Sequence, residues 1–224
     1  LADDAPSRVA SGSGGFSGTD TPLLQPRQTQ DADAFANIFI GIAGMIGAGK
    51  STLATALGQH LGIDTYYEPV ADNEYLADFY TDTPRYSFAM QVYLLNRRFQ
   101  QHQEIIWRGR SAVQDRTIYE DAYIFAPNLH AMGLMTTRDF ENYFRLFQNM
   151  DNSITPPDLM IYLRARVENL VDQIADRGRD YETSISIDYL KRLNERYEAW
   201  IDKYDKGKVL IVDIDDNRFH KNPE

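Results

Sequence analysis

The stretch from Gly44 to Ser51 reads GMIGAGKS and has the spacing G-x-x-x-x-G-K-[ST], which is typical of loops that bind nucleoside triphosphates. Glycines let the backbone curl so that several N–H groups point at a polyphosphate, and a following helix adds the positive end of its dipole. Lys50 would reach the β- and γ-phosphates, and Ser51 would bind Mg²⁺. The predicted ATP-binding residues of this loop are Gly44, Met45, Ile46, Gly47, Ala48, Gly49, Lys50, Ser51 and Thr52.

Charged side chains stand at the ends of two later predicted strands. Glu68 follows one of them, and Asp115 and Arg116 lie at the end of the next. Ligands of open parallel sheets bind beyond the carboxyl ends of the strands, so these side chains would meet beside the glycine-rich loop. If the third strand pairs with the first, Asp115 stands next to Ser51, where both could bind Mg²⁺. Glu68 could take a proton from an attacking hydroxyl, and Arg116 could span a phosphate or a carboxylate.

The predicted helix 84–108 carries polar residues within its apolar stripe. Gln91 and Arg98 follow the same three-to-four-residue spacing as Leu95, so all three share one face. We expect this face to line a pocket, with Arg98 paired to Asp121 and the Gln91 amide directed at the edge of a base. The alternative is that both polar side chains reach water at the edge of the stripe.

Two arginines flank a glycine at Arg177-Gly178-Arg179, between helices expected at 167–176 and 187–203. Such a segment could form a short lid that closes over transferring phosphates. A charged surface loop is the alternative, and this segment alone does not decide between them.

Apolar runs and helical periodicity alternate from Phe35 onward, which is typical of an α/β doubly wound domain. This pattern predicts an all-parallel sheet of five strands with helices on both faces. The strands are expected at 38–43, 64–67, 111–115, 158–163 and 208–213, and the helices at 51–61, 84–108, 118–132, 137–149, 167–176 and 187–203.

Composition limits the classes of partner. The 224 residues include 43% hydrophobic residues, enough for one domain at 37–224, preceded by a polar segment at 1–36. We expect that segment to be disordered or bound to a partner, because it cannot bury enough apolar surface to order itself. A net charge of −10 argues against nucleic acid as a partner, and no apolar stretch is long enough to span a membrane. The absence of cysteine fits an intracellular protein, in the cytoplasm or the mitochondrial matrix.

Taken together, these motifs resemble those of the deoxyribonucleoside kinase family, which includes deoxycytidine, deoxyguanosine and deoxyadenosine kinases. The resemblance covers about residues 37–219 and implies a P-loop kinase fold with a short Arg-rich lid. Its motifs here are the loop at 44–51, Glu68-Pro69-Val70, Asp115-Arg116-Thr117 with the following 119–126, and the lid with Glu182.

The resemblance also implies roles for individual residues. Glu68 is similar to the base that activates the sugar 5′-hydroxyl, with Asp115 near Mg²⁺ and Arg116 as its partner. Lys50, Arg177 and Arg179 would contact ATP. The implied substrate-binding residues are Glu68, Tyr80, Gln91, Arg98, Arg116, Asp121, Phe125 and Glu182, of which Tyr80 and Glu182 hold the 3′-hydroxyl and Phe125 packs on the ring.

The implied activity is transfer of the ATP γ-phosphate to the 5′-hydroxyl of a deoxyribonucleoside, deoxyadenosine or deoxyguanosine, with Mg²⁺. The chain is expected to form a homodimer or to be a subunit of a larger assembly. A kinase of the thymidylate type is one alternative. Another is an accessory subunit of a larger assembly, since respiratory complex I of mitochondria contains a subunit that looks like this family. The family's final helix is not found before Glu224, so the chain is expected to lack it.

Overall fold

The computed structural model describes residues 37–68, 73–177 and 186–215. The expectations for the segment 1–36 and for the side chains of Arg179 and Glu182 lie outside these residues.

A five-stranded, all-parallel sheet forms the centre of the domain, in the order β2-β3-β1-β4-β5. The register places Ile42 of β1 beside Asp115 of β3, so the predicted pairing of the first and third strands is confirmed. The strands β1 and β4 are largely apolar runs because helices cover both faces of the sheet. The strands are β1 (Phe39–Gly44), β2 (Asp64–Tyr66), β3 (Ala112–Asp115), β4 (Leu159–Arg164) and β5 (Lys208–Asp213).

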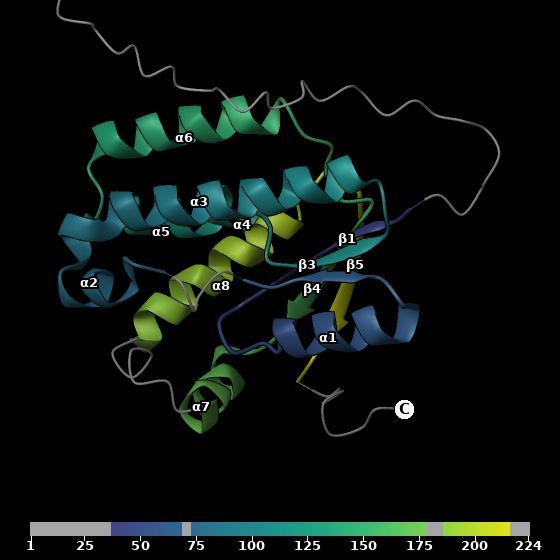
Figure 1. The fold of residues 1–224 in the computed structure, drawn as a ribbon. Helices are drawn as coiled ribbons and strands as arrows, with labels where there is room; N and C mark the ends of the chain where they lie inside the picture. Colours follow the sequence, from purple (N-terminus) through teal and green to yellow (C-terminus); the bar gives the residue numbers. More distant parts are fainter. Residues whose placement is uncertain (1–36, 69–72, 178–185, 216–224) are drawn as a thin grey trace, which may run out of the picture. The chain divides into compact units, whose positions relative to one another are not determined.

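Helices lie on both faces of this sheet, as predicted. Figure 1 shows α1 on one side, and α3, α5 and α6 on the other. The helix α3 contacts α6 and the π-helical turn η1, and η1 in turn contacts α8. The helices are α1 (Lys50–Leu61), α2 (Leu76–Thr81), α3 (Thr83–Arg108), α4 (Ile118–Glu120), η1 (Asp121–Phe125), α5 (Ala126–Ala131), α6 (Thr137–Asp151), α7 (Val167–Arg177) and α8 (Ile187–Ile201).

The segment predicted as one helix at 118–132 is helical throughout but changes its pitch. The wider turn η1 occupies Asp121–Phe125 between α4 and α5. Such π-turns occur frequently at functional sites. Here the turn follows β3 and the short α4, and it buries Asp121, the expected partner of Arg98.

One helix was not predicted. The short α2 has no buried residue and no side chain that caps its N-terminus, so it lacks both the apolar stripe and the capping signal by which helices are recognised. Among the described residues, no helix is long and apolar enough to cross a membrane.

Candidate active site

The glycine-rich loop connects β1 to α1 through a backbone that only glycine tolerates well. Gly47 has a φ of 85°, and a Cβ on it would lie 2.9 Å from Ile174 Cγ1 of α7. Lys50, the first residue of α1, folds back and donates to the Met45 carbonyl at 2.9 Å. Burial and the nearby Arg116 lower the pKa of Lys50 to about 8, although several carboxylates oppose them. The amine therefore remains largely charged at neutral pH, near the loop that would receive phosphates.

Ser51 and Asp115 meet as predicted at the carboxyl end of the central strands. The Ser51 hydroxyl donates to Asp115 Oδ2 at 2.5 Å, and the other carboxylate oxygen, Oδ1, is buried with no hydrogen-bond partner. A hydroxyl and an unpartnered carboxylate oxygen suit Mg²⁺, which takes its other ligands from phosphates and water. Within the described residues, no cluster of three or more acidic, His or Cys side chains could hold a metal by itself. These residues therefore fit a cation that arrives with the nucleotide.

Glu68 lies between two arginines. Its Oε1 accepts from Arg98 Nη2 at 2.6 Å and lies 3.1 Å from Arg116 Nε. Burial favours the neutral acid, but Arg116, Arg98 and Lys50 outweigh it and lower the pKa of Glu68 to about 2. Its side chain keeps 27% of its surface exposed, so an acceptor hydroxyl can approach it.

The Arg98 and Asp121 side chains form the predicted ion pair, fully buried between α3 and η1. Burial raises the pKa of Asp121 to about 6, although Arg98 acts in the opposite direction. Gln91 is also buried, which excludes the alternative that this stripe reaches water. Gln91 Oε1, Arg98 Nε and Asp121 Oδ2 lack hydrogen-bond partners among the described residues, and buried polar atoms in this state indicate a site for a polar ligand.

Arg116 is held in an unusual backbone conformation. Its φ of 68° makes it the one non-glycine residue with positive φ in the part of the chain that the structure describes. Such strain persists only where surrounding contacts impose it, and it concentrates at functional sites. The guanidinium carbon lies 4.5 Å from the centre of the Phe125 ring, and Nη1 donates to the Tyr197 hydroxyl at 2.7 Å.

Two residues of this site, Tyr197 and Glu120, were given no role by the sequence analysis, although Glu120 lies within the motif segment 119–126. Tyr197 comes from α8, and no sequence signal connects it to Arg116. Glu120 stands three residues after Thr117, a spacing typical of a helix capping box, and its Oε2 accepts from the Thr117 N–H at 2.9 Å. That spacing could have drawn attention to it.

For the remaining predicted site residues, the structure gives fewer contacts. Tyr80 lies in α2, with its ring 5.3 Å from that of Phe79. Arg177 is the last residue of α7. Because Arg179 and Glu182 lie outside the described residues, the lid stays a prediction.

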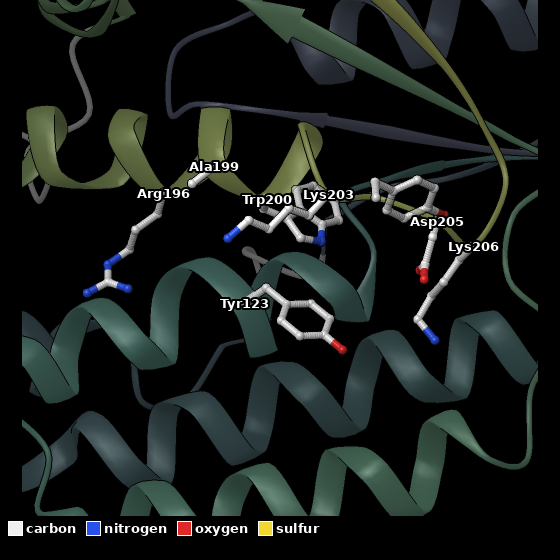
Figure 2. Close-up of a pocket in the computed structure, with 8 residues that line it drawn as sticks. Tyr123, Arg196, Ala199, Trp200, Lys203, Asp205 and Lys206 are labelled. Atoms are coloured by element: carbon white, nitrogen blue, oxygen red, sulfur yellow. The ribbon is translucent and has the colours of Figure 1, made fainter.

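A separate cavity of about 330 Å³ lies away from these residues, beside α8. Figure 2 shows Tyr123 and Trp200 among the side chains around it. Lys206, at its edge, is already paired with Asp151 at 2.8 Å. None of the residues around the cavity is a predicted site residue, although Tyr123 lies within the motif segment 119–126. The cavity is lined by Tyr123, Arg196, Ala199, Trp200, Lys203, Tyr204, Asp205 and Lys206.

Known proteins are similar to this chain in both sequence and fold. The family model described as deoxynucleoside kinase matches residues 40–224. The chain is 50% identical to a deoxyadenosine kinase of Dictyostelium discoideum over 72% of its own length, a match that covers 66% of that relative. It is 42% identical to a deoxyadenosine/deoxycytidine kinase of Bacillus subtilis, over 80% of this chain and 84% of the relative.

A solved structure shows the same arrangement. The deoxyadenosine kinase of M. mycoides with bound dATP superimposes with a TM-score of 0.72 at 28% identity, covering 84% of this chain and all of that one. The family match spans the loop at 44–51, Glu68 and the Asp115-Arg116 pair, which the structure brings together at one edge of the sheet. The chain therefore belongs to the deoxynucleoside kinase family.

Proposed function

We propose that this protein transfers the γ-phosphate of ATP to the 5′-hydroxyl of a deoxyribonucleoside, with deoxyadenosine as the preferred acceptor. One observation supports this most directly: Glu68 Oε1 contacts both Arg98, in the pocket with unpartnered polar atoms, and Arg116, beside the glycine-rich loop. A nucleoside whose base occupies the Arg98 pocket would then present its sugar at Glu68.

Glu68 would act as the general base. As the 5′-oxygen bonds to the γ-phosphorus, the hydroxyl proton passes to the Glu68 carboxylate, and the bond to the β,γ-bridging oxygen breaks with its electron pair remaining on ADP. A carboxylate held by two arginines is a weak base, so we expect the acceptor to replace one of these contacts when it binds. Arg98, which lies on the base side, is the partner to be released.

Positive groups would stabilise the transferring phosphate. Lys50 and Arg116 are cations on the donor side of Glu68, and they would stabilise the negative charge that develops on the γ-phosphate oxygens. Mg²⁺ held by Ser51 and Asp115 would neutralise part of the triphosphate charge. The lid residues Arg177, Arg179 and Glu182 would complete the site on closure, as the family resemblance implies.

The base pocket favours a base with an exocyclic amino group, as adenine has. Asp121 and Gln91 offer unpartnered acceptor oxygens, and Arg98 offers an unpartnered N–H, a pattern that suits an amino group next to a ring nitrogen. Relatives named as deoxyadenosine kinases support the same choice. Tyr80 would contact the sugar, and Phe125 would pack near the ring.

The alternatives find less support. A thymidylate-type kinase needs a free cation to bind an acceptor phosphate, whereas Arg98 is already paired with Asp121 and Glu68. An accessory subunit without activity would have no need for the Ser51–Asp115 contact or for the contacts of Glu68 with Arg98 and Arg116. As a free enzyme, the protein is expected to form a homodimer.

A radiolabelled-ATP assay tests this function. The purified chain is incubated with Mg²⁺ and each of the four deoxyribonucleosides, and with thymidine monophosphate. We expect 5′-monophosphate product, most from deoxyadenosine, and none from a Lys50→Ala variant of equal melting temperature. Product from thymidine monophosphate alone would favour the thymidylate-type kinase. No turnover of any acceptor, with copurification of the chain in a larger assembly, would favour the accessory subunit.

A further inference from the structure

The buried carboxylate of Glu120 joins three segments that are far apart in the sequence. Its Oε1 accepts from the N–H of Gly44, the first residue of the glycine-rich loop, at 3.3 Å, and from the Tyr197 hydroxyl of α8 at 2.8 Å. Its Oε2 accepts from the N–H of Thr117 at 2.9 Å. Neither Glu120 nor Tyr197 has a task in the proposed phosphate transfer, yet both are fully buried.

Arg116 has carboxylates on two of its edges. Its Nε faces Glu68 at 3.1 Å. Its Nη1 donates to the Tyr197 hydroxyl at 2.7 Å and lies 3.5 Å from Glu120 Oε1. The Tyr197 hydroxyl thus accepts from the guanidinium and donates its own proton to Glu120, so a single hydroxyl connects the two charged groups.

This arrangement opposes a collapse of Arg116 onto Glu68. An arginine beside one carboxylate tends to form a bidentate pair, which would occupy both the base and the phosphate-binding N–H groups. The contacts of Nη1 with Tyr197 and Glu120 hold the guanidinium away from such a pair with Glu68. The strained backbone of Arg116 fits a side chain that is held from both sides.

We propose that Glu120 and Tyr197 are positioning residues that hold the Arg116 guanidinium between the proposed base and the glycine-rich loop. The inference rests on the proposed function, because Arg116 must act on the transferring phosphate for its position to affect the rate. Loss of the Tyr197 hydroxyl would remove the 2.7 Å hydrogen bond from Arg116 Nη1. The longer contact of Nη1 with Glu120, at 3.5 Å, would remain.

The chain offers a matched pair of variants. Tyr162 stacks on Tyr197, with ring centres 5.8 Å apart and planes 14° apart, and its hydroxyl donates to Glu198 at 2.9 Å. Tyr197→Phe and Tyr162→Phe each remove one hydroxyl from the same contact between α8 and the sheet. Only the first removes a partner of Arg116.

Steady-state kinetics of both variants test the proposal. We expect Tyr197→Phe to lower kcat about tenfold, the value of a hydrogen bond to a charged group, with KM for ATP and deoxyribonucleoside changed by less than about twofold. Tyr162→Phe should keep kcat within about twofold. Glu120→Gln, which removes the charge and keeps the shape, should resemble Tyr197→Phe. Equal kcat values for the two tyrosine variants would overturn the proposal.

A combined variant shows whether the effect passes through Arg116. In an Arg116→Lys background the side chain cannot span both edges, so Tyr197→Phe should lower kcat no further. If the two losses multiplied, Tyr197 would act by another route and the proposal would be wrong.

A spectroscopic measurement separates this proposal from the proposed function. The Arg116 Nε–Hε resonance, assigned through its loss in Arg116→Lys, should shift in Tyr197→Phe and stay unchanged in Tyr162→Phe. This readout needs no turnover. A shift without activity in the wild type would overturn the proposed function while supporting the positioning contact, and an unchanged resonance in an active enzyme would overturn the positioning role.

Discussion

Glu68 illustrates how neighbouring charges decide what a single carboxylate can do. Burial alone would raise its pKa, yet Arg116, Arg98 and Lys50 lower that pKa to about 2. The ligand-free carboxylate is therefore always ionised at neutral pH but accepts a proton poorly. Its basicity should increase only when a substrate replaces Arg98, which would couple proton transfer to correct binding.

A Glu68→Gln substitution keeps the shape of the side chain and removes its ability to accept a proton. We expect kcat to fall by about 10²–10⁴-fold, with KM for the nucleoside changed little, as measured by initial-rate kinetics. Glu74→Gln makes the same chemical change at an exposed position and should have no effect. A large rise in KM at near-normal kcat would instead make Glu68 a binding residue.

Lys50 should make ATP binding depend on pH. Its pKa is lowered to about 8, chiefly by burial, so the amine is charged below this pH and neutral above it. A triphosphate favours the charged form, so the Kd for ATP should be nearly constant below pH 8 and rise above it, by at most about tenfold per pH unit. Isothermal titration between pH 6.5 and 9.5 measures this. Lys50→Arg does not titrate in this range and should remove the rise; the same rise in both proteins would assign it to another group.

At the scale of elements, the glycine-rich loop is fixed partly by α7. A Cβ at Gly47 would meet Ile174 of α7 at 2.9 Å, and the φ of 85° is itself unfavourable for alanine. Gly109 also has positive φ, but a Cβ there would meet nothing within 4 Å.

Alanine variants of these two glycines distinguish the effect of backbone strain from the effect of moving the glycine-rich loop. Gly47→Ala should weaken ATP binding as well as lower the melting temperature, because the loop must move away from α7. Gly109→Ala should cost about 1 kcal/mol of stability and leave the Kd for ATP unchanged. Calorimetry and ATP titration of both variants measure this. Equal ATP affinity in the two variants would show that the contact with Ile174 does not shape the phosphate site.

The elements and the motif residues were largely predictable from the sequence, and the contacts between distant elements were not. The strands β1 and β4 are apolar runs. The helix α3 begins directly after Asp82, which caps it, and has a proline in its first turn, so local signals mark where these elements begin. No such signal exists for α2 or for the wider turn η1. The Tyr197–Glu120 bond joins residues 77 positions apart, and only the packing of α8 against η1 brings them together.

The α3–η1 contact should decide which base is accepted. Removing only Arg98 leaves the buried Asp121 without its cation, at a cost of about 3–5 kcal/mol. Removing only Asp121 leaves Arg98 paired with Glu68 alone, so each single variant should impair every substrate. Arg98→Met with Asp121→Ala removes both charges and should raise the kcat/KM for thymidine relative to that for deoxyadenosine. Loss of hydrogen-bond discrimination can change such ratios by up to about 10⁴-fold. An unchanged ratio would show that this pair does not face the base.

At the scale of the whole molecule, the charges of the site nearly balance inside an acidic chain of net charge −10. A free triphosphate would therefore find little net attraction, which gives a physical reason for its cation to bind with it. The buried cations of the site are Lys50, Arg98 and Arg116, and the carboxylates around them are Glu68, Asp115, Glu120 and Asp121.

Ligand binding should stabilise the whole domain, because the ligand-free base pocket leaves polar atoms of Gln91, Arg98 and Asp121 without partners. At a concentration of 100 times its Kd, deoxyadenosine should add about 2.7 kcal/mol to the free energy of unfolding. For a domain of this size, that corresponds to a rise in melting temperature of about 5–11 °C in differential scanning calorimetry.

The matched control for this shift is the Arg98→Met, Asp121→Ala protein, which lacks the unpartnered atoms of Arg98 and Asp121 and keeps that of Gln91. Deoxyadenosine at the same concentration should raise its melting temperature much less, while ATP with Mg²⁺ should stabilise both proteins equally through the glycine-rich loop. If deoxyadenosine stabilised the two proteins to the same extent, the nucleoside would bind elsewhere, and the unpartnered atoms between α3 and η1 would need a different ligand.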